Sequence, residues 1–317
     1  MKPIKKYITD FLEYCEIEKG LSPISVKNYA QFLRQFEAWL DAQKLTTLTP
    51  KDLTAEHIWD YRIHLSRKRH PQTNEFLSKS TQSYYLIALR GLLSYFVDKD
   101  IKSLPPDKIK LPKDSKDHNV RFLSLEQLEK LLLSPNISNT KGLRDRAILE
   151  TFFSTGLRIA ELVSLNISDL GNTENNDGIE IQIIGKGGRA RTVYFSRRCL
   201  DWIGKYLSSR ADDDKSLFAR QNRGHSGEDS KRITARSIER VVKYYALRAG
   251  LPHSITPHVL RHTYATDLLS QGVDLRIIQE LLGHKNIVTT QIYTHVTNKE
   301  LREAHKKFHS GNKLKNS

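Results

Sequence analysis

The sequence predicts a mainly α-helical protein with one small antiparallel β-sheet, and three observations lead to this fold class. Apolar residues recur at helical spacing through the first hundred residues, with almost no strand pattern. The segment GIEIQIIGKGGRARTVYF, residues 178–195, alternates apolar and polar residues around a glycine-rich turn, which is typical of a β-hairpin. Residues 101–120 contain three prolines and many charges without periodicity, which indicates a linker between two domains.

The first domain, residues 1–100, is predicted as four helices over 4–19, 26–43, 53–69 and 80–100. Gly20 is expected to end the first helix, and Thr49-Pro50 supplies capping and first-turn residues before the third. Aromatic residues lie on the apolar faces of these helices, and we interpret them as core residues rather than platforms for stacked bases; they include Tyr29, Phe32, Phe36, Tyr61, Tyr84, Tyr95 and Phe96.

The second domain, residues 121–317, is predicted as helices around the hairpin. Ser124 and Gln127 form a capping-box pattern at its first helix. A longer helix is expected over 143–155, where Gly156 supplies the left-handed residue that ends it. Thr256-Pro257 precedes another helix over 258–270.

Charge is the most informative global property. The 317 residues carry 51 Lys and Arg against 36 Asp and Glu, a net charge of +15, and the excess lies on both sides of residues 101–120. A basic chain neutralises phosphates and releases their counterions, which favours nucleic acid as the partner. A merely basic solvated surface is the alternative. An anionic membrane is disfavoured, because no basic amphipathic segment with an aromatic apolar face is present.

No run approaches the roughly 20 apolar residues of a membrane span, and no signal-peptide core follows the N-terminus, so we expect a cytoplasmic protein without membrane contact. Cys15 and Cys199 lie far apart without a C-x-x-C partner. We interpret them as small apolar residues rather than a disulfide or a thiolate metal site.

Two segments pair arginine with helix N-termini. In STGLRIAELVSL, residues 154–165, Arg158 follows a glycine stop at the start of a short helix, which favours an anion, although a surface salt bridge explains it equally well. In PHVLRHTYATDLL, residues 257–269, His258 and Arg261 share the first turns of a helix, where a phosphate would be bound. His258 and His262 have the spacing of a zinc pair, but no third ligand is evident, so no metal is predicted.

Three further residues complete the candidate set. Lys186 lies in the glycine-rich hairpin turn, His284 follows an apolar helix, and Tyr293 stands nine residues beyond. Each alone has an ordinary structural interpretation. Together with Arg158, His258 and Arg261 they supply cations, a proton donor, a proton acceptor and a nucleophile, which is sufficient to break a phosphodiester without metal.

The blocks TGLRIAEL, IGKGGRAR, PHVLRHTYAT and LLGHKNIVTTQIYTHV resemble, in order and spacing, the catalytic signatures of the tyrosine recombinase (phage integrase) family, and the chain is most similar to its Xer-type members. The resemblance implies a helical SAM-like core-binding domain and a catalytic domain with the DNA breaking-rejoining fold. It implies site-specific cutting and rejoining of double-stranded DNA at inverted-repeat sites by homo- or hetero-tetramers, with no cofactor and no ATP. The tail from about residue 298 would dock on a neighbouring subunit.

In the roles that the resemblance implies, Tyr293 attacks the scissile phosphate and forms a 3′-phosphotyrosyl link. Arg158, Arg261 and His284 stabilise the phosphate charge, His258 takes the tyrosine proton and Lys186 protonates the leaving oxygen. Glu161 orients Arg158.

Three alternatives remain open at this point: a type IB topoisomerase that relaxes DNA, a non-catalytic DNA-binding regulator and a basic RNA-binding protein. The resemblance also leaves open the target sequence, the choice between chromosome dimer resolution and integration or inversion, and the need for a second recombinase or a DNA translocase.

Overall fold

The computed structural model describes residues 1–70, 73–112, 122–171, 178–185, 188, 190–220, 231–283, 306 and 309. The chain divides into two compact units, residues 1–118 and 119–317, which are described separately below. The boundary falls inside the segment 101–120 that was predicted as a linker.

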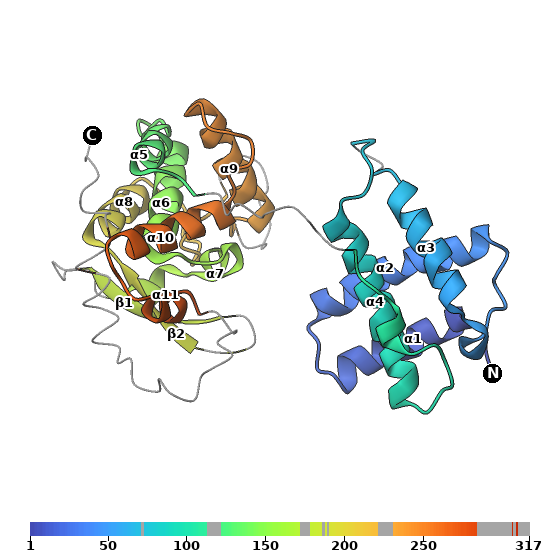
Figure 1. Ribbon diagram of the computed structural model, residues 1–317. Coiled ribbons are helices and arrows are strands. Elements are labelled where there is room, and N and C mark those ends of the chain that lie inside the picture. Colours follow the sequence, from blue (N-terminus) through green and yellow to red (C-terminus); the bar gives the residue numbers. More distant parts are fainter. Residues whose placement is uncertain are drawn as a thin grey trace. The chain divides into compact units, whose positions relative to one another are not determined.

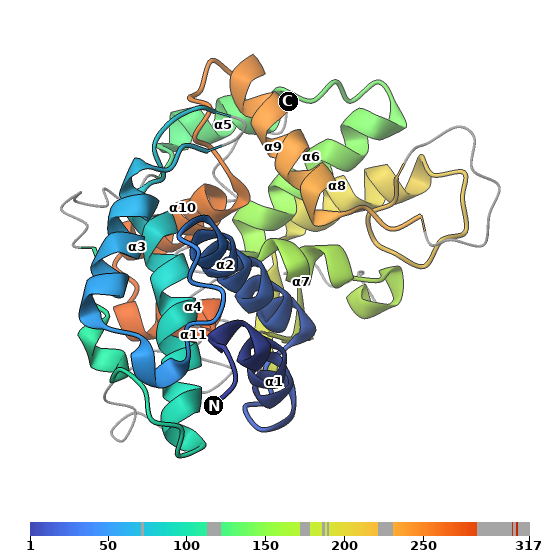
Figure 2. The same ribbon diagram turned by 90° about the vertical axis from the view of Figure 1, so that its right-hand side faces the viewer.

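The first unit is a bundle of four helices (Figures 1 and 2). Its elements are α1 (Ile4–Ile17), α2 (Pro23–Ala42), α3 (Ala55–Arg67) and α4 (Lys79–Asp98), with the 3-10 turns η1 (Pro50–Asp52) and η2 (Pro106–Lys108). Helices α1, α2 and α4 pack against one another, and α3 packs against α2 and α4. All four predicted helices are therefore present.

Side-chain caps set where these helices begin. The third helix was predicted from residue 53, but Thr54 accepts a hydrogen bond from the His57 backbone N–H (3.3 Å), and α3 begins after this cap. Ser78 likewise accepts from the Thr81 N–H (3.1 Å), so α4 begins at Lys79, one residue before the predicted start at Ser80. Boundaries predicted from periodicity missed these caps by one or two residues.

Aromatic residues form much of the core of the first unit. The ring of Phe36 lies 5.0 Å from that of Tyr61 in an edge-to-face contact, and both side chains are buried. Tyr84 differs from the prediction, because it is 54% exposed. Tyr84 stacks on Phe32 instead of entering the core.

The chain beyond α4 continues to pack on the first unit. Ile109 is buried, while Ile101, Leu104 and Leu111 pack against the same core. Of the segment predicted as a linker, the part through residue 112 thus contributes to the first unit, and 113–120 lies outside the described residues.

The second unit is mainly helical with one two-stranded sheet, which confirms the predicted fold class. Its helices are α5 (Leu125–Leu133), α6 (Thr140–Thr155), α7 (Ile159–Ser164), α8 (Arg197–Ser208), α9 (Ala235–Arg248), α10 (Pro257–Ser270) and α11 (Leu275–Leu282), with the 3-10 turn η3 (Ile167–Leu170). Strands β1 (Ile179–Ile184) and β2 (Ala190–Phe195) pair antiparallel, with Ile183 opposite Arg191.

Helix α6 forms the centre of this unit and is buried along most of its length. It packs against α8, α10 and β2, while α11 packs against α10 and β2 (Figure 1). The C-terminal end of α6 therefore lies close to the elements that carry the predicted site. Among the described helices of both units, none is long and apolar enough to cross a membrane.

Candidate active site

Arg158 is positioned by the turn that ends α6. Gly156 adopts the left-handed conformation (φ +60°), as predicted, and its amide donates to the Phe152 carbonyl. A Cβ atom at Gly156 would lie 2.5 Å from Cδ1 of Tyr264, so the close packing also requires glycine. The chain then enters α7 with Arg158 as the N-cap residue, its side chain 27% exposed.

Glu161 binds both the backbone and the side chain of Arg158. One carboxylate oxygen, Oε2, accepts from the Arg158 backbone N–H (2.7 Å), and Oε1 accepts from its guanidinium (2.9 Å). Because Glu161 is buried, it holds this guanidinium in one orientation. These bonds place Glu161 against Arg158, where the resemblance implied an orienting residue.

Arg261 reaches the same place from α10. Its guanidinium is buried and donates to the carbonyl of Gly156 (2.5 Å) and to that of Leu282. Arg158 donates to the carbonyl of the next residue, Gly283 (3.0 Å). The structure therefore brings together two arginines that are far apart in the sequence, at the end of α11.

Arg191, a residue that sequence reasoning did not select, completes the cluster. It projects from β2, donates to both oxygens of Glu161 (2.8 Å each) and donates through Nε to the carbonyl of Leu281 (3.2 Å). We refer to Arg158, Arg191, Arg261 and Glu161 as the site cluster. The only sequence signal for Arg191 was its place in the basic hairpin, because its partner carboxylate lies thirty residues away.

Three guanidinium groups face one carboxylate in the site cluster, so positive charge is in excess. Burial, followed by repulsion from Arg158 and Arg191, lowers the pKa of Arg261 to about 9. For Glu161, burial acts to raise the pKa, but the hydrogen bonds from Arg191 and Arg158 outweigh it and lower the value to about 2. Glu161 is therefore ionised at neutral pH, and the cluster favours an additional anion.

His258 occupies the first turn of α10, after the Thr256 cap and Pro257, and its side chain is exposed. His262 lies one turn further on, and burial together with His258 and Arg261 lowers its pKa. Within the described ranges, no three histidine, cysteine or carboxylate side chains gather closely enough to hold a metal ion.

Lys186, His284 and Tyr293 lie outside the described residues. Their predicted roles thus stay predictions. The described part of the site ends at Gly283, the residue before His284, which adopts the left-handed conformation (φ +62°). The described geometry is nevertheless that of an anion site, because Arg158 is partly exposed and lies next to the buried side chains of Arg191 and Arg261.

The described tail residue His309 packs on its own unit. Its ring lies 4.6 Å from that of Phe153 and 5.5 Å from that of Tyr264, and Nε2 is 2.7 Å from the Phe153 carbonyl. Burial lowers the pKa of His309 to about 4, so the ring is neutral at physiological pH and donates to this carbonyl.

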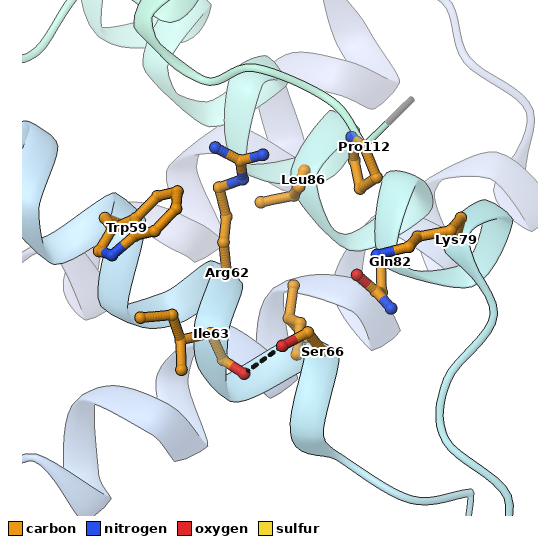
Figure 3. Close-up of a pocket in the computed structure, with 9 residues that line it drawn as sticks. Trp59, Arg62, Ile63, Ser66, Lys79, Gln82, Leu86 and Pro112 are labelled. Atoms are coloured by element: carbon orange, nitrogen blue, oxygen red, sulfur yellow. Dashed lines mark hydrogen bonds between the residues drawn. The ribbon is translucent and has the colours of Figure 1, made fainter. Parts of the chain in front are cut away.

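The first unit contains a separate pocket of about 270 Å³ between α3 and α4. Figure 3 shows its lining, which is Trp59, Arg62, Ile63, Leu65, Ser66, Lys79, Gln82, Leu86 and Pro112. Arg62 lies over the Trp59 ring at 5.5 Å, and no carboxylate is among the lining residues. This pocket is therefore positively charged, but it lies in a different unit from the site cluster.

Each of the two units matches a known protein family. Residues 121–300 match the phage integrase family, and residues 8–100 match the phage integrase N-terminal SAM-like domain. The chain is 35% identical to the tyrosine recombinase XerD of Lacticaseibacillus casei over 308 residues, covering 95% of this chain and 98% of that protein. It is 36% identical to the tyrosine recombinase XerC of Pelobacter propionicus, with 98% and 97% covered.

A solved structure also supports this similarity. The XerH site-specific recombinase in a pre-cleavage complex with its difH substrate matches with a TM-score of 0.65 and 26% identity, covering 94% of this chain and 83% of that one. The chain belongs to the phage integrase family. Within this family it is similar over most of its length to the Xer-type tyrosine recombinases, which confirms the predicted family and the predicted enzyme class, a site-specific DNA recombinase.

Proposed function

We propose that this chain cuts and rejoins double-stranded DNA at a specific site through a covalent link between Tyr293 and a 3′-phosphate. The observation that supports this most strongly is the site cluster, in which Arg158 and Arg261 meet with an excess of positive charge. In the proposal these two guanidiniums bind the non-bridging oxygens of the scissile phosphate. They stabilise the charge that develops there in the transition state.

The remaining roles follow from the chemistry of each group. The Tyr293 phenol attacks phosphorus, His258 accepts its proton and Lys186 donates a proton to the departing 5′-oxygen. His284 donates a further hydrogen bond to the phosphate. The phosphotyrosyl bond conserves the energy of the broken phosphodiester, so a new 5′-hydroxyl can reverse the step without ATP or metal.

The partner in this proposal is a duplex with inverted recombination half-sites, bound by four recombinase subunits on two sites. The XerH structure contains its difH DNA substrate, which supports a duplex partner.

The cationic pocket beside Trp59 would contact the DNA backbone from the first unit, because Arg62 and Lys79 supply charge without a competing carboxylate. Similarity to XerC and XerD supports an Xer-like role, and within it chromosome dimer resolution is the role that we propose.

The tail from about residue 298 would dock on the neighbouring subunit in this assembly. His309 packs against Phe153 and Tyr264 of its own chain, so docking in trans would require this contact to open or to exchange. We therefore expect the tail to leave its own unit when subunits associate.

Trapping of covalent adducts tests the proposal directly. The protein is incubated with a pool of nicked duplexes of random sequence, and DNA that remains attached after denaturation is sequenced. Wild type should give adducts enriched in one inverted-repeat sequence, and Tyr293→Phe should give none while still binding that sequence. Tyr244→Phe, which alters an exposed tyrosine on α9, is the matched control and should behave as wild type. Adducts that persist in Tyr293→Phe would refute the assignment.

A further inference from the structure

All three guanidinium nitrogens of Arg191 donate hydrogen bonds within the protein. Its side chain is 7% exposed, its two terminal nitrogens donate to the two oxygens of Glu161, and Nε donates to the Leu281 carbonyl. Arg158, in contrast, keeps 27% of its side chain exposed. Arg191 is therefore poorly placed to touch a DNA phosphate, but it connects β2 to both α7 and α11.

The bonds around Glu161 show how Arg191 acts on Arg158. Each carboxylate oxygen accepts one hydrogen bond from Arg191 and one from Arg158. A carboxylate held by only one of these partners could rotate about its side-chain bonds. With Arg191 on the opposite side, Glu161 is fixed, and the guanidinium of Arg158 is fixed with it.

A second set of bonds reaches the end of α11. Its last carbonyls, those of Leu281, Leu282 and Gly283, accept from Arg191, Arg261 and Arg158 respectively. The negative end of the helix dipole favours this arrangement. A Cβ atom at Gly283 would lie 2.7 Å from Cδ of Arg191, so Arg191 packs directly against the residue that precedes His284 in the sequence.

We propose that Arg191 is a positioning residue for DNA strand cleavage, which fixes Arg158 through Glu161 and fixes the end of α11 through Leu281 without touching the phosphate. This inference rests on the proposed function, in which Arg158 and Arg261 bind the scissile phosphate. Lysine cannot replace Arg191, because a single ammonium group cannot bind both carboxylate oxygens in parallel and also reach the Leu281 carbonyl.

Arg191→Lys tests this role, because it keeps the charge and removes the planar fork. Two quantities are measured on the duplex that wild type captures covalently: the Kd, in a Tyr293→Phe background, and the single-turnover rate constant of adduct formation. We expect the Kd to change by less than about twofold and the rate constant to fall by about 10- to 100-fold. Arg197→Lys, on the exposed surface of α8, is the matched control and should change neither quantity.

Glu161→Gln distinguishes positioning from a general loss of structure, since it preserves shape and remains informative if Arg191→Lys folds poorly. If Arg191 acts through Glu161, the double variant should cleave about as slowly as the slower single variant, because both remove the same interaction. Rate losses that multiply would overturn the inference. So would a wild-type rate in Arg191→Lys, or equal losses of binding and cleavage. If wild type itself forms no adduct with any duplex, the proposed function fails, and this inference fails with it.

Discussion

Two groups of arginines in the second unit can be compared. One lies beside the middle of α6, and the other lies beyond the C-terminal end of this helix. In the first, Arg146 and Arg198 share Glu150, and we call these three residues the inner cluster. The second is the site cluster. Both contain more arginines than carboxylates, so an excess of buried positive charge does not by itself identify a functional site.

Access distinguishes the two groups. The side chains of Arg146, Glu150 and Arg198 are at most 4% exposed, and Arg146 also lies 4.4 Å from the centre of the Trp202 ring. The inner cluster is thus covered by protein, and an anion from solvent cannot reach its arginines. In the site cluster Arg158 remains open to solvent, and the carbonyls at the end of α11 hold the guanidiniums in place. A site for an anion needs both the charge and the opening.

The same substitution in both groups gives the sharpest test of this difference. Arg261→Met removes a cation from the site cluster, and we expect the rate of adduct formation to fall by about 10²- to 10³-fold. Repulsion among the three arginines is relieved at the same time, so the free energy of unfolding should stay within about 2 kcal/mol of wild type. Single-turnover cleavage and chemical denaturation measure the two effects. If Arg261→Met cleaved DNA at the wild-type rate, the site cluster would be no more functional than the inner cluster.

Arg146→Met is the counterpart in the inner cluster. It leaves Arg198 and Glu150 as a one-to-one ion pair and replaces a buried cation with an apolar chain of similar length. We expect the free energy of unfolding to change by less than about 2 kcal/mol and cleavage to stay within about threefold of wild type. A large loss of cleavage with normal stability would show that the inner cluster has a function.

His309 extends the comparison to a buried histidine. Its pKa is lowered to about 4 in the folded state, against about 6.5 when unfolded, so the unfolded chain binds more protons between these values. Its contribution to stability is therefore complete above pH 6.5 and is lost as the pH falls toward 4.

Between pH 7 and pH 5, wild type should lose about 1 to 2 kcal/mol of stability more than His309→Gln. Thermal unfolding of the two proteins across this range measures the difference. Parallel curves would mean that His309 is not buried in solution as it is in the structure.

Periodicity and capping signals were enough to predict the four helices of the first unit, the hairpin and the left-handed residue at Gly156, because these depend on neighbours in the sequence. The burial of Tyr84 was predicted wrongly, since an apolar stripe does not tell how far a partner helix extends. Arg158 and Arg261 were identified because they lie in distinctive local blocks. Arg191 was missed because its role depends on Glu161 and Leu281, which are distant in the sequence.

The end of α11 has a consequence for how this chain can change in length. Successive residues of an α-helix are rotated by about 100° and rise about 1.5 Å. One residue inserted between Leu275 and Gly283 would turn each carbonyl away from its arginine and offer the wrong one in its place. The helix therefore works as a fixed-length spacer. Insertions and deletions among natural variants of this protein are expected to avoid it.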